Sequence, residues 1–293
     1  MGTIIEAVAT ATADGEPSAG AVALADVAAR SCLERAHRTA DDVELLINAG
    51  VYFDRNISEP AIAALIQEDI GANPEQLAGA GQGTLSFDVR HGACGLLTGI
   101  YLVDSMLASG TVGLGMVVAT DADPEPGVSE GFAFPALGGA VLLSADASRP
   151  GFTAFRFATF PEFAELFQSA VDWRENRSGG HNVLSVEIAG DYADRALECA
   201  ESTARELAAT ERLDLGEVEL LIATASVPGF AGELGRRLGL SGERVASPPD
   251  RLAAAHTAAL AAALESRRLA AGCTTLFVSA GSGLTVVAAL YRA

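Results

Sequence analysis

The stretch Ala25–Gly50, ADVAARSCLERAHRTADDVELLINAG, has a counterpart much later in the chain at Ala193–Thr224, ADRALECAESTARELAATERLDLGEVELLIAT. Each stretch is an alanine-rich segment with helical periodicity, followed by a polar turn and a short apolar run. The two runs share the letters VELLI, at Val43–Ile47 and Val218–Ile222. A continuous apolar run of this length indicates a strand that is buried on both faces. The match therefore predicts a chain built from two similar halves.

The similarity continues beyond these strands. In each half a helix, a turn, a second helix and a strand follow, and a glycine-rich turn then leads into an apolar strand, at Gly138–Leu143 and at Gly281–Val287. The second helix of the second half is predicted over Leu252–Ala271. Strands that alternate with helices indicate right-handed βαβ units and an α/β fold. We therefore expect a layered sandwich of two five-stranded sheets with helices between them.

The sequence predicts that the chain is divided into three segments. The two similar halves occupy residues 1–150 and 183–293. Residues 151–182 differ from both halves in composition, because they are rich in phenylalanine and contain Trp173. We interpret them as a linker and a hydrophobic cap, which either packs between the halves or forms part of a wall for an acyl group.

Composition limits the classes of protein. Of 293 residues, 49% are hydrophobic and 19% are charged, which is typical of a globular chain with a large core. The net charge of −19 argues against nucleic acid or an anionic membrane as a partner, since both require a basic surface. No apolar run is long enough to span a bilayer, and the N-terminus does not resemble a secretion signal. We expect a cytoplasmic protein.

Motifs for metals and nucleotide cofactors are not found. There is no CxxC pair, no G-x-G-x-x-G after the first strand of either half and no phosphate-binding loop, so we expect neither a metal nor a cofactor. The four cysteines fit a reducing compartment as free thiols. Three of them are interpreted as small core residues: Cys32, Cys199 and Cys273.

The fourth cysteine lies at a strand-to-helix corner in Ser86–Gly99, SFDVRHGACGLLTG. A thiol at a helix N-terminus has a lowered pKa and can act as a nucleophile. Cys94 is therefore either a catalytic nucleophile or a small buried residue at the corner.

Several of these segments, in this order on a duplicated α/β chain, resemble the thiolase superfamily and specifically its ketoacyl-ACP synthase III branch. They include Phe87–Gly110 and Gly281–Arg292. The resemblance implies a layered αβαβα sandwich of two duplicated halves. It also implies a cytoplasmic transferase of fatty acid or polyketide biosynthesis, or of secondary metabolism. Its substrate would be an acyl thioester of coenzyme A or an acyl carrier protein, and it would act as a dimer.

The resemblance also implies a site. Cys94 would carry the acyl group, and the backbone N–H groups of Cys94 and Ser282 would form the oxyanion hole. Matching Ala255-His256-Thr257 to the Gly-Asn-Thr of the family makes His256 the base.

The sequence departs from the family at three positions. The histidine of the family falls on Thr224, and its asparagine falls on Asp250 when no gap is allowed. In the same ungapped register Ala93 takes the nucleophile position, and a one-residue insertion restores Cys94. Both registers remain open.

Two functions follow from these departures. The first is acyl transfer through a cysteine acyl-enzyme, but not standard decarboxylative condensation, because the histidine and asparagine that stabilise the enolate are missing. The alternative is a catalytically inactive subunit that pairs with an active paralogue. The chain would form a homodimer or a heterodimer, and we expect the interface along the strand Val112–Ala119.

Overall fold

The computed structural model describes residues 2–13, 20–73, 83–176 and 179–293. The first half contains β1 (Gly2–Thr12), α1 (Ala21–Ala36), β2 (Leu45–Asn48), α2 (Ile62–Ile70), β3 (Leu85–Asp88), α3 (Gly95–Ala108), β4 (Leu114–Asp121) and β5 (Leu137–Asp146). The remainder contains β6 (Gly151–Thr159), β7 (Phe167–Asn176), β8 (Gly179–Ile188), α4 (Tyr192–Glu211), β9 (Leu220–Thr224), α5 (Phe230–Arg237), β10 (Val245–Ala246), α6 (Ala259–Glu265), β11 (Thr274–Gly281) and β12 (Thr285–Arg292).

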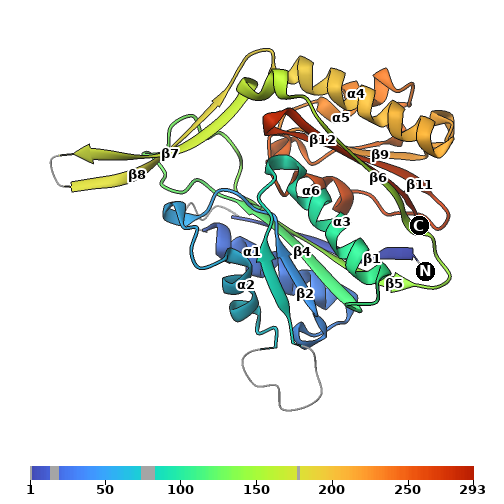
Figure 1. Ribbon diagram of the computed structural model, residues 1–293, viewed down its shortest axis with the longest axis horizontal. Coiled ribbons are helices and arrows are strands. Elements are labelled where there is room, and N and C mark those ends of the chain that lie inside the picture. The colour runs from blue at the N-terminus through green and yellow to red at the C-terminus, as the bar shows by residue number, and fades with distance from the viewer. Residues whose placement is uncertain (1, 14–19, 74–82, 177–178) are drawn as a thin grey trace.

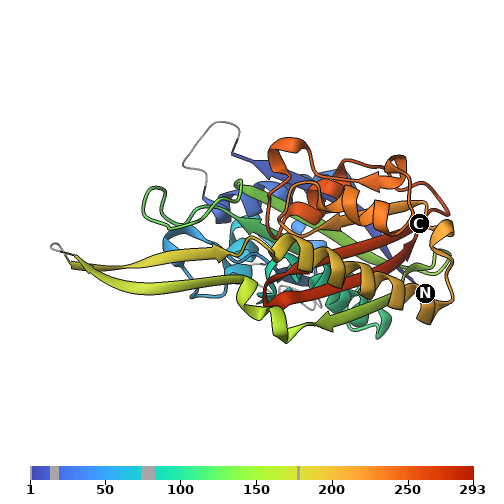
Figure 2. The ribbon, with the colours of Figure 1, turned by 90° about the horizontal axis from the view of Figure 1, so that it is seen from above.

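Two five-stranded sheets form the body of the molecule, as the sequence predicted. Their strand orders are β1-β5-β4-β2-β3 and β10-β9-β11-β12-β6. Helices α1 and α2 pack on the outer face of the first sheet, and α4 and α5 pack on the outer face of the second. Helices α3 and α6 lie between the two sheets (Figures 1 and 2). The five layers give the predicted αβαβα sandwich.

The VELLI runs lead into β2 and β9, which are interior strands of the two sheets. Every residue of Leu45–Asn48 and of Leu220–Thr224 is buried. Each of these strands pairs in parallel with a strand from the end of its own half, β4 and β11. Because both faces are covered by helices, alternation with polar residues is absent and the run reads as continuously apolar.

Small residues allow the helices to lie close to the sheets. A Cβ on Gly138 would lie 2.4 Å from the carbonyl oxygen of Leu24 in α1, and one on Gly139 would lie 2.7 Å from the Cβ of Ala261 in α6. The two glycines of β5 therefore let one helix approach each face of the strand. This close packing explains why the sequence is rich in alanine and glycine.

Helix α6 is shorter than the sequence predicted. It covers Ala259–Glu265 rather than Leu252–Ala271. A short 3-10 turn, η7 (Asp250–Leu252), and an irregular turn precede it, and this turn carries His256 into the interior. Periodicity alone did not reveal the break, since the alanines around it are buried whether or not they are helical.

Two expectations about segments need correction. Strand β4, which covers most of Val112–Ala119, lies between β2 and β5 and pairs with both, so its backbone is not free to form a dimer interface. Within 151–182, interpreted as a linker and cap, β6 pairs with β12 and belongs to the second sheet. Strands β7 and β8 form a long hairpin that projects from the body, with Trp173 exposed on it (Figure 1).

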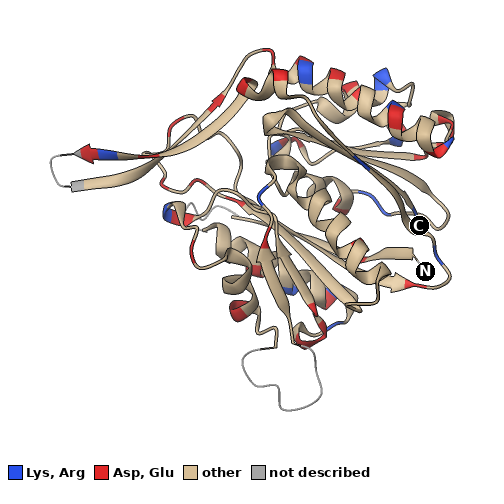
Figure 3. Ribbon diagram, viewed as in Figure 1, with Lys and Arg blue, Asp and Glu red and all other residues tan. Residues whose placement is uncertain are grey.

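Charged residues lie mainly on the outer helices, the loops and the hairpin, while the strands of both sheets are almost free of them (Figure 3). Among the described residues, no helix has the length and apolar character that crossing a bilayer requires.

Candidate functional site

A buried carboxylate and a buried histidine meet where the two halves join. Asp121 ends β4 in the first half, and His256 lies just before α6 in the second. His256 Nδ1 and Asp121 Oδ2 are 3.3 Å apart. The same oxygen accepts hydrogen bonds from Thr257 N at 2.8 Å and Thr257 Oγ1 at 2.5 Å. Asp121 Oδ1 accepts from the backbone N–H groups of Val51 and Tyr52 at 3.1 and 2.9 Å.

These contacts keep Asp121 ionised. Burial raises its pKa, but the electrostatic interaction with His256 and the hydrogen bonds from His256, Thr257 and Tyr52 outweigh burial and hold the pKa below its ordinary value. A carboxylate can only accept hydrogen bonds, so Nδ1 of His256 must be the donor. In the neutral imidazole this leaves a lone pair on Nε2, which is the state that a general base requires.

Aromatic rings surround the imidazole. The ring of Phe134 stacks on it with centroids 4.8 Å apart, and the rings of Tyr52 and Phe167 lie at 5.2 and 5.8 Å. Phe134 comes from the loop before β5, and Phe167 begins β7 of the hairpin. This shell removes water from the ring and strengthens its contact with Asp121.

Nε2 of His256 lies near a corner where Gly92 has no side chain. It is buried and has no hydrogen-bond partner among the described residues. A Cβ placed on Gly92 would lie 3.8 Å from this nitrogen and 3.0 Å from Ser282 Oγ. Ser282 begins the 3-10 turn η8 (Ser282–Leu284), which joins β11 to β12. Gly92 thus leaves room for an atom that contacts the histidine and the serine together.

The side chain of Cys94 packs into the core against β11 and β12. Its side chain is fully buried, and Sγ lies 3.3 Å from the carbonyl oxygens of Ser279 and Thr285. Burial raises the pKa of the thiol to about 12. The Cys94 N–H, predicted as an oxyanion donor, already donates to His91 O at 3.1 Å within the 3-10 turn η3 (Gly92–Cys94).

Ala93 lies beside Cys94 on the same turn, and the backbone of both residues adjoins Gly281. A Cβ on Gly281 would lie 3.2 Å from Ala93 N, 3.5 Å from Cys94 N and 3.6 Å from Ala93 Cβ. The amide of Ala93 therefore adjoins the turn between β11 and β12, where Ser282 begins. A helix rotates by about 100° per residue, and this rotation separates the two neighbouring side chains.

Three hydroxyl groups near the carboxyl ends of β9 and β11 were not recognised from the sequence as a set. Thr224 and Ser279 lie opposite one another on these parallel strands, so their side chains share one face of the sheet. Ser226 follows β9 with a positive φ of 57°. All three hydroxyl oxygens are buried without a partner among the described residues. Only Thr224 had been singled out, as the position of the family histidine.

Two pockets flank the hairpin strand β7. One, of about 480 Å³, is lined by Phe167, Ser169 and Ser282. The other, of about 140 Å³, is lined by Tyr52, Arg90 and again Ser169. Each pocket shares one aromatic residue with the shell around His256. Both pockets therefore border the residues that surround His256.

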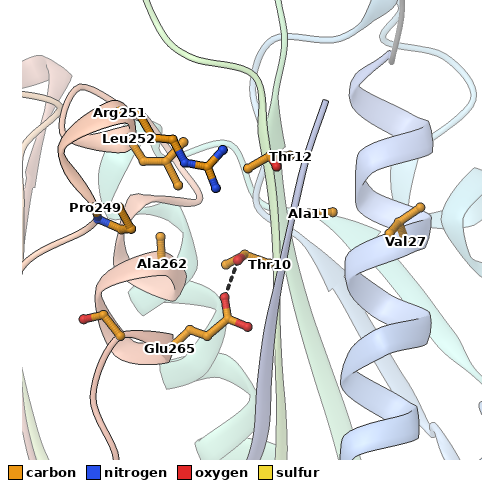
Figure 4. Close-up of a pocket in the computed structure, with 10 residues that line it drawn as sticks. Thr10, Ala11, Thr12, Val27, Pro249, Arg251, Leu252, Ala262 and Glu265 are labelled. Carbon is orange, nitrogen blue, oxygen red and sulfur yellow. Dashed lines mark hydrogen bonds between the residues drawn. The ribbon is translucent and has the colours of Figure 1, made fainter. Parts of the chain in front are cut away.

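A further pocket, of about 520 Å³, also borders the shell around His256, through Phe134. A pocket of about 410 Å³ lies between β1 and α6, and Thr10 donates a hydrogen bond to Glu265 in its wall (Figure 4). Glu265 also accepts a hydrogen bond from Arg35. His91 has its Nδ1 2.8 Å from Thr98 Oγ1, and burial lowers the pKa of its ring. Asp250, the ungapped position of the family asparagine, lies on the exposed turn η7. No cluster of potential metal ligands occurs in the described part of the chain.

Solved structures with this architecture are known, although no protein-family profile and no curated protein matches the chain. The 3-oxoacyl-[acyl-carrier-protein] synthase III of Aquifex aeolicus superimposes with a TM-score of 0.78 at 18% identity, covering 100% of both chains. OleA from Xanthomonas campestris, with bound lauric acid and lauroyl-CoA, gives 0.79 at 15% identity, covering 100% of this chain and 99% of the other. FabH from Pseudomonas aeruginosa PAO1, also a 3-oxoacyl-(acyl carrier protein) synthase III, gives 0.77 at 17% identity, covering 100% and 98%.

The chain therefore has the thiolase-like fold of ketoacyl synthase III. This confirms the fold that the resemblance implied. At such low identity the likeness concerns the fold, and the chemistry has to be argued from the residues of the site.

Proposed function

We propose that this protein binds an acyl thioester of coenzyme A or an acyl carrier protein at the His256 site and transfers its acyl group. The observation that carries the proposal is the buried, unpartnered Nε2 of His256, whose ring is held by the ionised Asp121. It faces the corner where Gly92 and Ser282 meet. One similar structure contains lauroyl-CoA, which supports an acyl thioester as the ligand class.

His256 serves as general acid and base in this proposal. Nε2 removes the proton from an attacking hydroxyl or amine, which adds to the thioester carbonyl. The carbon–sulfur bond then breaks, and the thiolate takes the proton from Nε2. The backbone N–H of Ser282, whose nitrogen lies 3.8 Å from the Gly92 Cβ position, is the proposed donor to the oxyanion.

A Cys94 acyl-enzyme is the competing version of this function. It would require the thiol to leave its buried position and ionise, although burial raises its pKa to about 12. It would also require Cys94 N–H to release His91 O before that N–H could hold an oxyanion. Acyl transfer that depends on His256 and not on Cys94 fits this geometry better.

The test is release of free thiol from lauroyl-CoA and acetyl-CoA, with and without amine and alcohol acceptors. His256→Ala should lower the rate by about 10²–10⁴-fold. His37→Asn is the matched control, because His37 is exposed at the end of α1 with a positive φ that asparagine tolerates. Equal rates for His256→Ala and the native chain would contradict the proposal.

The second candidate is a catalytically inactive subunit that pairs with an active paralogue. Alanine beside the corner and aromatic rings packed around His256 favour it. Thiol release that appears only when a second ketoacyl-synthase-like chain is added, and that is unchanged by His256→Ala, would support this alternative.

A further inference from the structure

The side chain of Ser282 is the only hydroxyl among the atoms closest to the Gly92 Cβ position, which also borders His256 Nε2. Oγ lies 3.0 Å from that position and Nε2 lies 3.8 Å from it on another segment. Rotation about one side-chain bond moves Oγ toward or away from Nε2. Hydrogen bonds between a nucleophile and its base are often long in a protein without substrate.

Ser282 also differs from the other hydroxyls near the site in its access to solvent. It is partly exposed and lines the pocket of about 480 Å³ beside the hairpin. Thr224, Ser226 and Ser279 are buried, and no pocket among those described reaches them. Ser282 is thus the hydroxyl that both a thioester from the pocket and the histidine base can approach.

We infer that Asp121, His256 and Ser282 form a catalytic triad, in which Ser282 Oγ takes the acyl group from the thioester as a serine ester. This rests on the proposed function and names the nucleophile that it left open. A serine hydroxyl needs an adjacent base to act as a nucleophile, and a base needs a third group to fix its tautomer. His256 and Asp121 are placed to fill these roles, although they come from different halves of the chain.

The first step balances without any further reactant. Ser282 Oγ–H gives its proton to His256 Nε2 as Oγ bonds to the carbonyl carbon. The carbon–sulfur bond breaks, the thiol leaves with the proton from Nε2, and the acyl group remains on Oγ as an ester. In the second step an alcohol, an amine or water attacks the ester with the same base, and Ser282 recovers its proton.

The absence of a side chain at Gly92 supports the same inference. A Cβ on this residue would contact Ser282 Oγ at 3.0 Å and would lie 3.8 Å from His256 Nε2. Gly92→Ala should therefore lower acyl loading together with Ser282→Ala. Gly110→Ala is the matched control, because Gly110 also has a positive φ, 70° against 51°, but a Cβ there would have no neighbour within 4 Å.

The experiment measures thiol release from lauroyl-CoA together with the acyl mass gained by the intact protein. Ser282→Ala should remove the adduct and lower thiol release by roughly 10³–10⁶-fold, as loss of a triad nucleophile does. Ser282→Cys should retain an acyl adduct, and Cys94→Ala should leave both readings unchanged. Loss of thiol release in His256→Ala but not in Ser282→Ala would overturn the triad and leave the proposed function standing.

If the native chain releases no thiol, the proposed function fails, and labelling by a fluorophosphonate decides the triad separately. A phosphonyl group on Ser282 that is lost in His256→Ala supports the triad, and an unlabelled Ser282 overturns it.

Discussion

At the scale of single residues, the hydroxyls near the site fall into two groups. Thr257 Oγ1 donates to the buried carboxylate of Asp121, whereas Thr224 Oγ1 is buried without a partner among the described residues. Loss of a hydrogen bond to a charged group costs about 1.5–3 kcal/mol, while removal of an unpaired buried hydroxyl costs little or is favourable.

Thr257→Val should therefore lower the free energy of unfolding by about 2 kcal/mol, and Thr224→Val should leave it unchanged or raise it. Valine replaces threonine with nearly equal volume, so the two variants form a matched pair. Urea denaturation followed by circular dichroism measures both. An equal loss in the two variants would show that Thr224 has a partner and that the distinction fails.

At the scale of elements, Asp26 of α1 and Asp69 of α2 form a pair of neighbouring carboxyl groups. Burial, followed by the charge of Asp69 and a hydrogen bond to it, raises the pKa of Asp26 to about 7. In an unfolded chain this pKa is about 3.9, so between these values the folded state binds more protons. The free energy of unfolding should therefore fall as pH rises from about 4 through about 7.

Asp26→Asn should flatten this dependence and raise stability at pH 8 relative to the native chain. Asp69→Asn should do so to a smaller extent, because it removes the repulsion from Asp69 but leaves the burial of Asp26. Urea denaturation at a series of pH values checks both variants. If the native profile rises between pH 4 and 7, or neither variant changes it, the assignment of this pair is incorrect.

Some elements could be predicted from the sequence, and others could not. The strands β2 and β9 and the helices before them were predictable because periodicity and burial are local properties of a segment. The place of β6 in the second sheet and of β4 inside the first was missed, since strand pairing joins residues far apart in the chain.

The residues of the site also divide into those that the sequence predicted and those that it did not. His256 and Ser282 were reached through the family motif, but Asp121 was not. Its role depends on the end of β4 meeting the turn before α6 across 135 residues. The burial of the Cys94 thiol could not be read from the sequence either, because one residue of rotation at the helix start decides it.

At the scale of the whole molecule, β3 lies at one edge of the first sheet. Among the strands that the structure describes, β3 pairs with β2 alone, and Leu85 on it is 53% exposed. Exposed strand edges tend to pair with another chain. We predict a homodimer through β3, in place of the interface expected along β4.

Sedimentation velocity of the native chain should show the dimer, and Leu85→Lys should shift it toward monomer. Val171→Lys is the control, because Val171 is 49% exposed but lies on the hairpin rather than at this edge. A native monomer, or a dimer that Val171→Lys breaks and Leu85→Lys does not, would contradict the prediction.

The central claim is that the acyl group passes through Ser282 under the control of His256, and that Cys94 belongs to the core. Peptide mapping by tandem mass spectrometry, after brief incubation with lauroyl-CoA and acid quenching, tests it most directly. We expect the acyl group on the peptide that contains Ser282, with the Cys94 peptide unmodified. An acyl group on Cys94 would contradict it.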